Sequence, residues 1–154
     1  MTPLVFIPPE DFAHAVRVTP LVAIDLILRD PLGAVLVGLR NNEPAKGFWF
    51  VPGGRIGKNE RLVEAFARLL EVETGLSIPF AEARLLGAYE HFYDTNRFCE
   101  PGYGTHYVVL GYELQLEARP TIKLDDQHSA IKWMAVPALL AAPDVHDNTK
   151  AYFR

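Results

Sequence analysis

The predicted helix from Asn59 to Thr74 has a carboxylate in its apolar stripe, and this most constrains the fold. Leu62, Phe66 and Leu69 recur at the spacing of one helix face, and the next position on that face is Glu73. An unpaired charge on a face that packs against a sheet costs free energy. Two interpretations stay open: the helix end frays and Glu73 reaches water, or Glu73 meets a cation such as Mg²⁺, which prefers oxygen ligands.

The residues around this helix support its ends and suggest a ligand at its start. Asn59 is a predicted N-cap, and Gly75 stands where a left-handed C-terminal residue is expected. Just before the helix, Gly53 and Gly54 would let backbone groups approach a ligand closely, and the N-terminus of a helix favours phosphate. The remaining glutamates are predicted to lie on a solvated face: Glu60, Glu64 and Glu71.

Apolar segments on both sides of the helix predict strands. Thr19 to Leu28 and Ala34 to Leu39 form a predicted hairpin, and Phe48 to Val51 is a short strand that Pro52-Gly53-Gly54 breaks. Further strands are expected at Leu85 to His91, His106 to Leu116 and Ile131 to Met134. Further helices are expected at Asp11 to Val16, Val136 to Ala142 and Asn148 to Phe153. This order predicts an α/β fold with a mixed sheet covered on both faces.

Length and charge exclude several classes of protein. The 154 residues fit one domain, 1–154, with an N-terminal segment at 1–18. A net charge of −4 argues against a general nucleic-acid or membrane-surface partner, because both require a basic field. No apolar run reaches the ~18 residues of a membrane span, and no secretion signal is visible at the N-terminus. Cys99 is the single cysteine and is expected to be an inert thiol in a reducing cytoplasm.

The segment from Gly54 to Leu76 resembles the motif of the Nudix hydrolase family, G-x5-E-x7-R-E-U-x-E-E-x-G-U, in which U is a bulky apolar residue. The residues that match are Gly54, Glu60, Arg68, Leu70, Glu73, Gly75 and Leu76. The resemblance implies the Nudix fold, an α/β/α sandwich around a mixed β-sheet. It also implies metal-assisted attack on a nucleoside diphosphate that is linked to another group.

Two departures from the motif narrow the resemblance. Leu69 and Val72 replace glutamates that gather metal ions in most members, so fewer ions are expected and the base must come from elsewhere. The GDP-mannose mannosyl hydrolase branch has the same losses, and the similarity to it covers nearly the whole chain. The similar segments are 11–12, 19–22, 47–55, 91–94, 105–111, 126–128 and 148–153. The branch implies a homodimer in which the N-terminal segment reaches the partner.

Cleavage at a sugar C1 carbon requires a base for water and stabilisation of the leaving group. GDP is already acidic, so charge neutralisation by a metal and arginines replaces a general acid, unlike the carboxylate pair of common glycosidases. Histidine suits the base because its pKa is ordinarily ~6.5. His128 matches the catalytic histidine of the branch, and Arg40 and Arg55 match its arginines on the diphosphate. From the residues alone, an exposed loop histidine and solvated arginines remain alternatives.

The resemblance also assigns metal and substrate contacts. It implies Mg²⁺, with Mn²⁺ as a substitute, held by the Gly53 carbonyl, Glu73 and Gln127. Asp25 interrupts an apolar strand, where Asp is unfavourable, and it matches a sugar-hydroxyl contact. The other implied substrate contacts, of which Phe12 would stack on guanine, are Phe12, Arg68, His91, Tyr93 and Tyr107. Core packing explains the aromatic residues about equally well.

The sequence therefore predicts a Mg²⁺-dependent enzyme that hydrolyses GDP-mannose, or another GDP-hexose such as GDP-glucose or GDP-fucose, at C1. The products would be GDP and the free sugar with inversion. One alternative is a Nudix pyrophosphohydrolase that attacks phosphorus and yields GMP and a sugar phosphate. A second alternative, from a different class, is an inert nucleotide-binding module.

Overall fold

The computed structural model describes residues 6–123 and 128–154. Its centre is the hairpin of β1 (Leu21–Arg29) and β2 (Val35–Arg40), as predicted. The turn between these strands is held by Asp30, whose carboxylate accepts hydrogen bonds from the backbone of Leu32 and Ala34 at 3.0 and 2.8 Å. Such local bonds from Asp to the following backbone are a common reason for a turn at this residue.

The sheet is mixed, with strand order β3-β2-β1-β6-β5 and two further strands attached to it. β1 runs parallel to β6, and the other pairings are antiparallel. β4 pairs with β1, and β7 pairs with β2. The remaining strands are β3 (Trp49–Phe50), β4 (Gly53–Arg55), β5 (Arg84–Tyr93), β6 (Thr105–Gln115) and β7 (His128–Met134).

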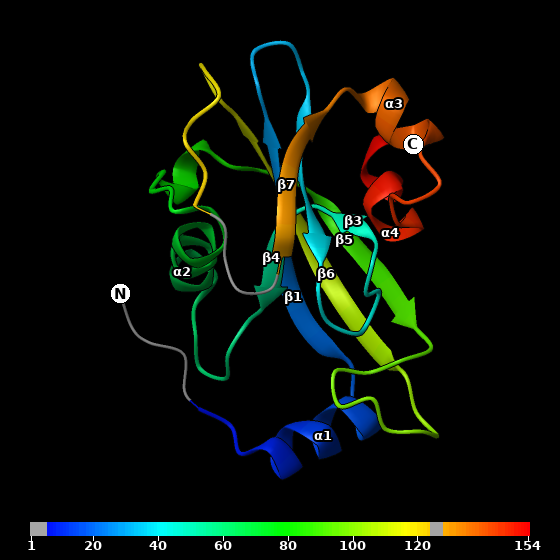
Figure 1. Ribbon diagram of the computed structural model, residues 1–154. Helices are drawn as coiled ribbons and strands as arrows, with labels where there is room; N and C mark the ends of the chain where they lie inside the picture. The colour runs from blue at the N-terminus through cyan, green and yellow to red at the C-terminus, as the bar shows by residue number, and fades with distance from the viewer. Residues whose placement is uncertain (1–5, 124–127) are drawn as a thin grey trace.

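Helices cover both faces of this sheet, which confirms the predicted α/β/α arrangement (Figure 1). On one side lies α2 (Leu62–Thr74), followed by a short 3₁₀ turn at Phe80–Glu82. The other side carries α3 (Val136–Ala141), α4 (Asp147–Lys150) and the 3₁₀ turn Ala151–Phe153, while α1 (Pro9–Val18) lies across one end of the sheet (Figure 1).

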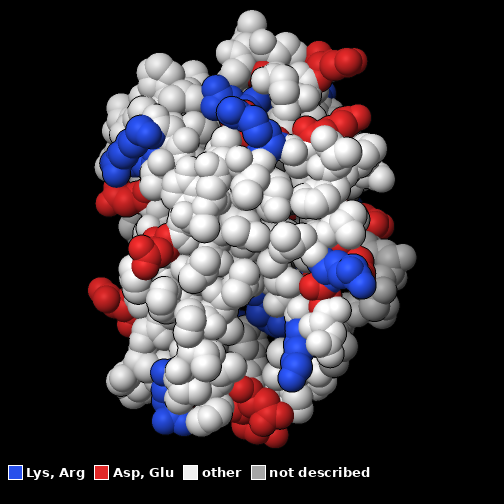
Figure 2. All heavy atoms as spheres, turned by 180° about the vertical axis from the view of Figure 1, so that it is seen from behind, with Lys and Arg blue, Asp and Glu red and all other residues white. Residues whose placement is uncertain are grey.

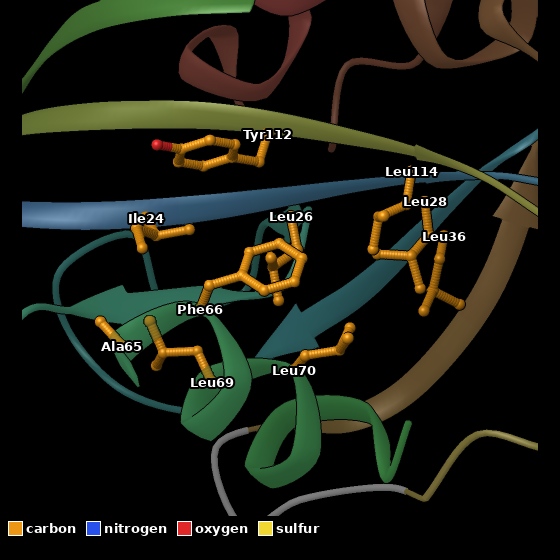
Figure 3. Close-up of a cluster of buried hydrophobic side chains, with 10 residues drawn as sticks. All are labelled: Ile24, Leu26, Leu28, Leu36, Ala65, Phe66, Leu69, Leu70, Tyr112 and Leu114. Atoms are coloured by element: carbon orange, nitrogen blue, oxygen red, sulfur yellow. The ribbon is translucent and has the colours of Figure 1, made fainter. Parts of the chain in front are cut away.

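The core between α2 and the sheet forms around Phe66, which is fully buried. Its ring points from α2 toward Ile24 and Leu26 of β1 (Figure 3) and lies 5.9 Å from the ring of Tyr112 on β6. A second apolar cluster on the opposite face includes Ile27, Val35, Val37, Leu139 and Val145. The alternation of these residues along β1 explains why the strand is apolar almost throughout: both of its faces are covered.

The start of α2 differs from the sequence prediction. The helix begins at Leu62, not Asn59, and Asn59 makes no cap but adopts a left-handed conformation with φ of 67°. Glu60 is not solvated, because its carboxylate accepts from the Gly57 amide at 2.9 Å and pairs with Arg68 at 2.7 Å. These bonds hold the segment in a turn ahead of the helix. Leu62 is accordingly 41% exposed, whereas the left-handed Gly75 was predicted correctly.

Other strand and helix boundaries also differ from the prediction. Gly53-Gly54 does not end the sheet locally, because β4 pairs with β1 there. β7 begins at His128 instead of Ile131, so His128 lies in a strand and not in a loop. α1 is longer than predicted. Among residues 6–123 and 128–154, no helix is both long and apolar enough to span a membrane.

Charged side chains are distributed without a broad basic field on the face seen in Figure 2. There, Lys and Arg groups are interspersed with Asp and Glu around a largely uncharged centre. On this face, the positive charge of Lys and Arg therefore lies in separate local groups.

Candidate active site

Two adjoining cavities are lined by every described residue that the sequence analysis assigned to catalysis, metal binding or substrate binding. The inner cavity is lined by Asp25, Arg40, Gly53, Arg55, His91, Tyr93, Tyr107 and His128. The outer cavity is lined by Phe12, Arg40, Arg55, Arg68, Glu73, Arg97 and Tyr107. Arg40, Arg55 and Tyr107 face both. Gln127, the other expected metal ligand, lies outside the described residues.

Strand register explains how these distant residues meet. Asp25 on β1 is the Cα partner of Gly53 on β4, and Arg40 at the end of β2 is the partner of His128 on β7. Across the sheet, His91 on β5 pairs with Tyr107 on β6. A shift by one residue would turn each of these side chains to the opposite face. The pairing of the strands therefore places the site.

Glu73 is buried beside His128. The residue is 5% exposed, and one carboxylate oxygen lies 3.7 Å from Nδ1 of His128. The fraying interpretation of Glu73 is therefore wrong, because α2 continues past it and ends at Gly75. His128 is 7% exposed, and its ring fits because a Cβ on Gly38 would stand only 2.6 Å from it. Gly38 was missed by sequence reasoning, although a glycine inside a strand often marks such a close approach.

The two motif departures have different surroundings. Leu69 is 3% exposed and packs beneath Gly54, where an added Cβ would approach its side chain to 2.5 Å. Val72 is 51% exposed and lines the outer cavity. Glu73 is thus the motif carboxylate left in contact with the site. Within the part of the chain that the structure describes, no group of three or more His, Cys, Asp or Glu could hold a metal ion.

This donor set fits a hard divalent ion that takes most of its ligands from elsewhere. Glu73 supplies a buried carboxylate oxygen, and Gly53 on β4, which lines the inner cavity, has a carbonyl as a neutral oxygen. A Cβ on Gly53 would lie only 2.4 Å from a carboxylate oxygen of Asp25, so only glycine fits at this position. No side chain at residue 53 therefore covers the backbone there. Mg²⁺ characteristically uses one or two carboxylates and fills its octahedron with phosphate oxygens and water.

Asp25 is held by a tyrosine near the C-terminal end of the sequence. The hydroxyl of Tyr152 donates to its carboxylate at 2.6 Å. Burial raises the pKa of Asp25 to about 7, although the hydrogen bond from Tyr152 and the charge of Arg40 oppose the rise. Tyr152 was missed by sequence reasoning, because nothing in its local pattern points to a residue on β1.

The Tyr152→Phe variant should destabilise the protein by about 1–2 kcal/mol, because Asp25 would lose a donor in a partly buried setting. Urea unfolding measures the change. Tyr103→Phe is a matched control, since its hydroxyl donates to Glu100 at an exposed position, and its stability should stay within about 0.5 kcal/mol of wild type. Equal effects of the two changes would contradict a special role for the Tyr152 hydroxyl.

His91 is a buried polar group that faces the inner cavity. It is 4% exposed, and its Nε2 has no hydrogen-bond partner among the described residues. Burial is the main cause that lowers the pKa of His91 to about 4, with nearby His146 adding to the effect. An unsatisfied ring nitrogen in a cavity is available to a ligand hydroxyl.

The depressed pKa of His91 makes stability depend on pH. The folded protein keeps this ring neutral down to about pH 4, whereas the unfolded chain takes up a proton below ~6.5. Stability should therefore fall as the pH decreases, by about 2 kcal/mol between roughly pH 7.5 and pH 5. In His91→Gln this part of the pH dependence should disappear. It should persist in His14→Gln, whose ring is exposed, and a loss in both would refute the assignment.

The outer residues Phe12 and Arg68 make contacts within the protein. The Arg55 guanidinium lies 4.7 Å above the Phe12 ring, so a guanine stacked on that face would have to displace it. Arg68 pairs with Glu60 and donates to the Arg55 carbonyl at 2.9 Å. It therefore supports the backbone that presents Arg55. Cys99 is an exposed thiol outside both cavities.

The mixed sheet, α2 with its motif and the buried Glu73 together define a Nudix domain. The NUDIX domain family profile matches residues 19–154, so the chain belongs to the Nudix family.

Among proteins with established descriptions, the chain resembles the low-salt glycan biosynthesis protein Agl8 of Haloferax volcanii. The two are 41% identical over 135 residues, which cover 88% of this chain and 83% of Agl8.

Two solved structures show the same fold. The MutT protein from Methanosarcina mazei Go1 superposes with a TM-score of 0.69 at 19% identity, covering 87% of this chain and 91% of that chain. The NUDIX domain of Shewanella oneidensis NrtR, complexed with ADP ribose, gives a TM-score of 0.68 at 19% identity and covers 96% of each chain. At these identities the likeness concerns the fold alone.

Proposed function

We propose that this protein hydrolyses GDP-mannose, or another GDP-hexose, at the sugar C1 carbon to GDP and the inverted free sugar. The observation that carries the proposal is the placement of His128, buried beside Glu73 and paired across strands with Arg40 in a cavity that also holds Asp25. The description of Agl8 as a glycan biosynthesis protein supports a nucleotide-linked sugar as the substrate class.

In the proposed reaction, His128 accepts a proton from water. The water oxygen bonds to C1 while the bond from C1 to the bridging oxygen of GDP breaks, and the electron pair leaves with the diphosphate. Arg40 and Arg55 face both cavities and would stabilise that growing negative charge. Asp25 and His91 face the inner cavity, where they would accept or donate hydrogen bonds to sugar hydroxyls.

Glu73, the Gly53 carbonyl and Gln127 would hold Mg²⁺, with Mn²⁺ as a substitute. When bound, the ion would neutralise part of the diphosphate charge. The Glu73→Gln variant should bind Mn²⁺ at least about tenfold more weakly, as followed by electron paramagnetic resonance of the free ion, because a charged ligand becomes a neutral one. Glu71→Gln, an exposed change on the same helix, should leave the affinity unaltered. Equal Mn²⁺ affinity in wild type and Glu73→Gln would remove Glu73 from the metal site.

Hydrolysis in ¹⁸O-labelled water tests the bond that is cleaved. Attack at C1 puts the label in the free hexose and leaves GDP unlabelled. The pyrophosphohydrolase alternative would instead put the label in GMP or the sugar phosphate, and this result would refute the proposal. Absence of turnover with binding retained would favour the inert nucleotide-binding module.

We also propose a homodimer in which the N-terminal segment contacts the partner. Phe6, ahead of α1, is 80% exposed in the single chain. Burial of such a ring against a partner lowers the free energy of the system. Sedimentation equilibrium of the full chain and of a chain lacking residues 1–8 tests this arrangement. A monomer in the full chain would contradict it.

A further inference from the structure

Arg97 lies outside the motif, in the loop that connects β5 to β6, and its side chain lines the outer cavity. The loop is held by its neighbour Asn96, which is fully buried. The Asn96 amide donates to the carbonyls of Glu100 and Tyr103 at 2.9 Å and accepts from the amides of Phe98 and Glu100. These four hydrogen bonds to the Asn96 side chain fix the backbone of the loop from which Arg97 extends.

Three guanidinium groups in this cavity stand apart from the described carboxylates. Among the described residues, Arg40, Arg55 and Arg97 form no ion pair within 4.0 Å, whereas Arg68 in the same cavity is paired with Glu60. The Arg40 Nε donates to the Pro44 carbonyl, and Arg55 lies over Phe12. Of the cavity carboxylates, Glu43 accepts from Thr95 and Glu73 faces His128.

These three arginines line the outer cavity together with Tyr107. Burial raises the pKa of its hydroxyl, and the positive charges of Arg40, Arg55 and Arg97 oppose the rise. Three like charges around one point repel one another, and an anion with several oxygens between them would relieve that repulsion. The planar fork of Arg suits phosphate oxygens, which it binds in pairs.

We propose that Arg97 is a third phosphate-binding arginine, which secures the diphosphate of the nucleotide in the outer cavity together with Arg40 and Arg55. This inference rests on the proposed function only in taking a nucleoside diphosphate as the ligand. Arg97 is exposed at the cavity edge, so it is a binding group and not one that acts on the C1 carbon. Its contribution should be the same for substrate and product, because both carry the diphosphate.

The test is calorimetric titration of the full-length protein with GDP, inorganic pyrophosphate and guanosine in the presence of Mg²⁺. Arg97→Gln should weaken GDP and pyrophosphate binding by about tenfold or more, because a charge-assisted contact is lost, and should leave guanosine unchanged. Arg97→Lys keeps the charge but not the fork and should fall between wild type and Arg97→Gln. Arg61→Gln is the matched control, since that side chain is exposed and faces neither cavity.

Each outcome bears on the inference separately from catalysis. If Arg97→Gln binds GDP within about twofold of wild type, or if wild type binds neither GDP nor pyrophosphate, the inference is overturned. If the wild-type protein binds GDP through Arg97 but labels phosphate in ¹⁸O water, the inference stands and the C1 chemistry fails. If C1 cleavage is observed while Arg97→Gln keeps its GDP affinity, only the inference fails.

Discussion

Replacing His128 with Gln should lower kcat for GDP-mannose hydrolysis by about 10²–10⁴-fold, the range typical for loss of a general base. Gln keeps a hydrogen-bonding side chain of similar size but cannot take a proton from water. The KM should change little, because His128 belongs to the inner cavity and the diphosphate is expected at the arginines. Steady-state release of GDP gives both constants.

His14→Gln is the matched control for this change, because His14 is exposed on α1 and lines neither cavity. Its kcat should equal that of wild type. Unchanged kcat in His128→Gln would show that another group acts as the base. Thermal unfolding of His128→Gln must accompany the kinetics, since the ring packs tightly over Gly38.

Arg40→Gln is expected to lower kcat by about 10²–10³-fold, with a smaller change in KM. The guanidinium stands at the junction of the two cavities, and its Nε is fixed by the Pro44 carbonyl at 3.0 Å. A group oriented in this way stabilises charge that grows on the leaving diphosphate without having to rearrange. The loss of Arg40 should therefore weaken mainly the stabilisation of the transition state, which is measured as a lower kcat.

The division between kcat and KM decides the role of Arg40. A rise in KM with kcat unchanged would mark it as a group that binds ground state and transition state equally. Arg40→Lys separates charge from geometry, because Lys offers a point charge in place of the fork. Arg61→Gln again provides the control for loss of a surface arginine.

Much of the fold was predictable because its signals are local. The β1–β2 hairpin, α2 with its end at Gly75, and the strands β5 and β6 follow from apolar periodicity and turn residues, and the structure confirms them. The errors arose where a specific side-chain contact prevails over local preference. Asn59 does not cap α2, because the ion pair of Glu60 with Arg68 keeps the preceding turn out of the helix.

The candidate site divides in the same way. Glu73 could be found from one helix face, since a charge in an apolar stripe is visible in the sequence. Arg97 and Tyr152 could not, because neither has a local pattern that connects it to the site. Gly38 offered only the general signal of a glycine inside a strand. His128 was predicted in a loop, but it begins β7 and pairs with Arg40.

The sequence by itself determined the chemistry that the chain carries: a helix with one inward carboxylate, a Gly-Gly-Arg segment before it, and arginines and histidines near strand ends. Tertiary structure alone decided which of these groups meet. Asp25 and Tyr152 are 127 positions apart and share a hydrogen bond of 2.6 Å, and Arg97 lines the outer cavity from a loop that the Asn96 side chain holds. The physical reason is that periodicity and turn preference act over a few residues, whereas strand register and packing set the contacts between distant segments.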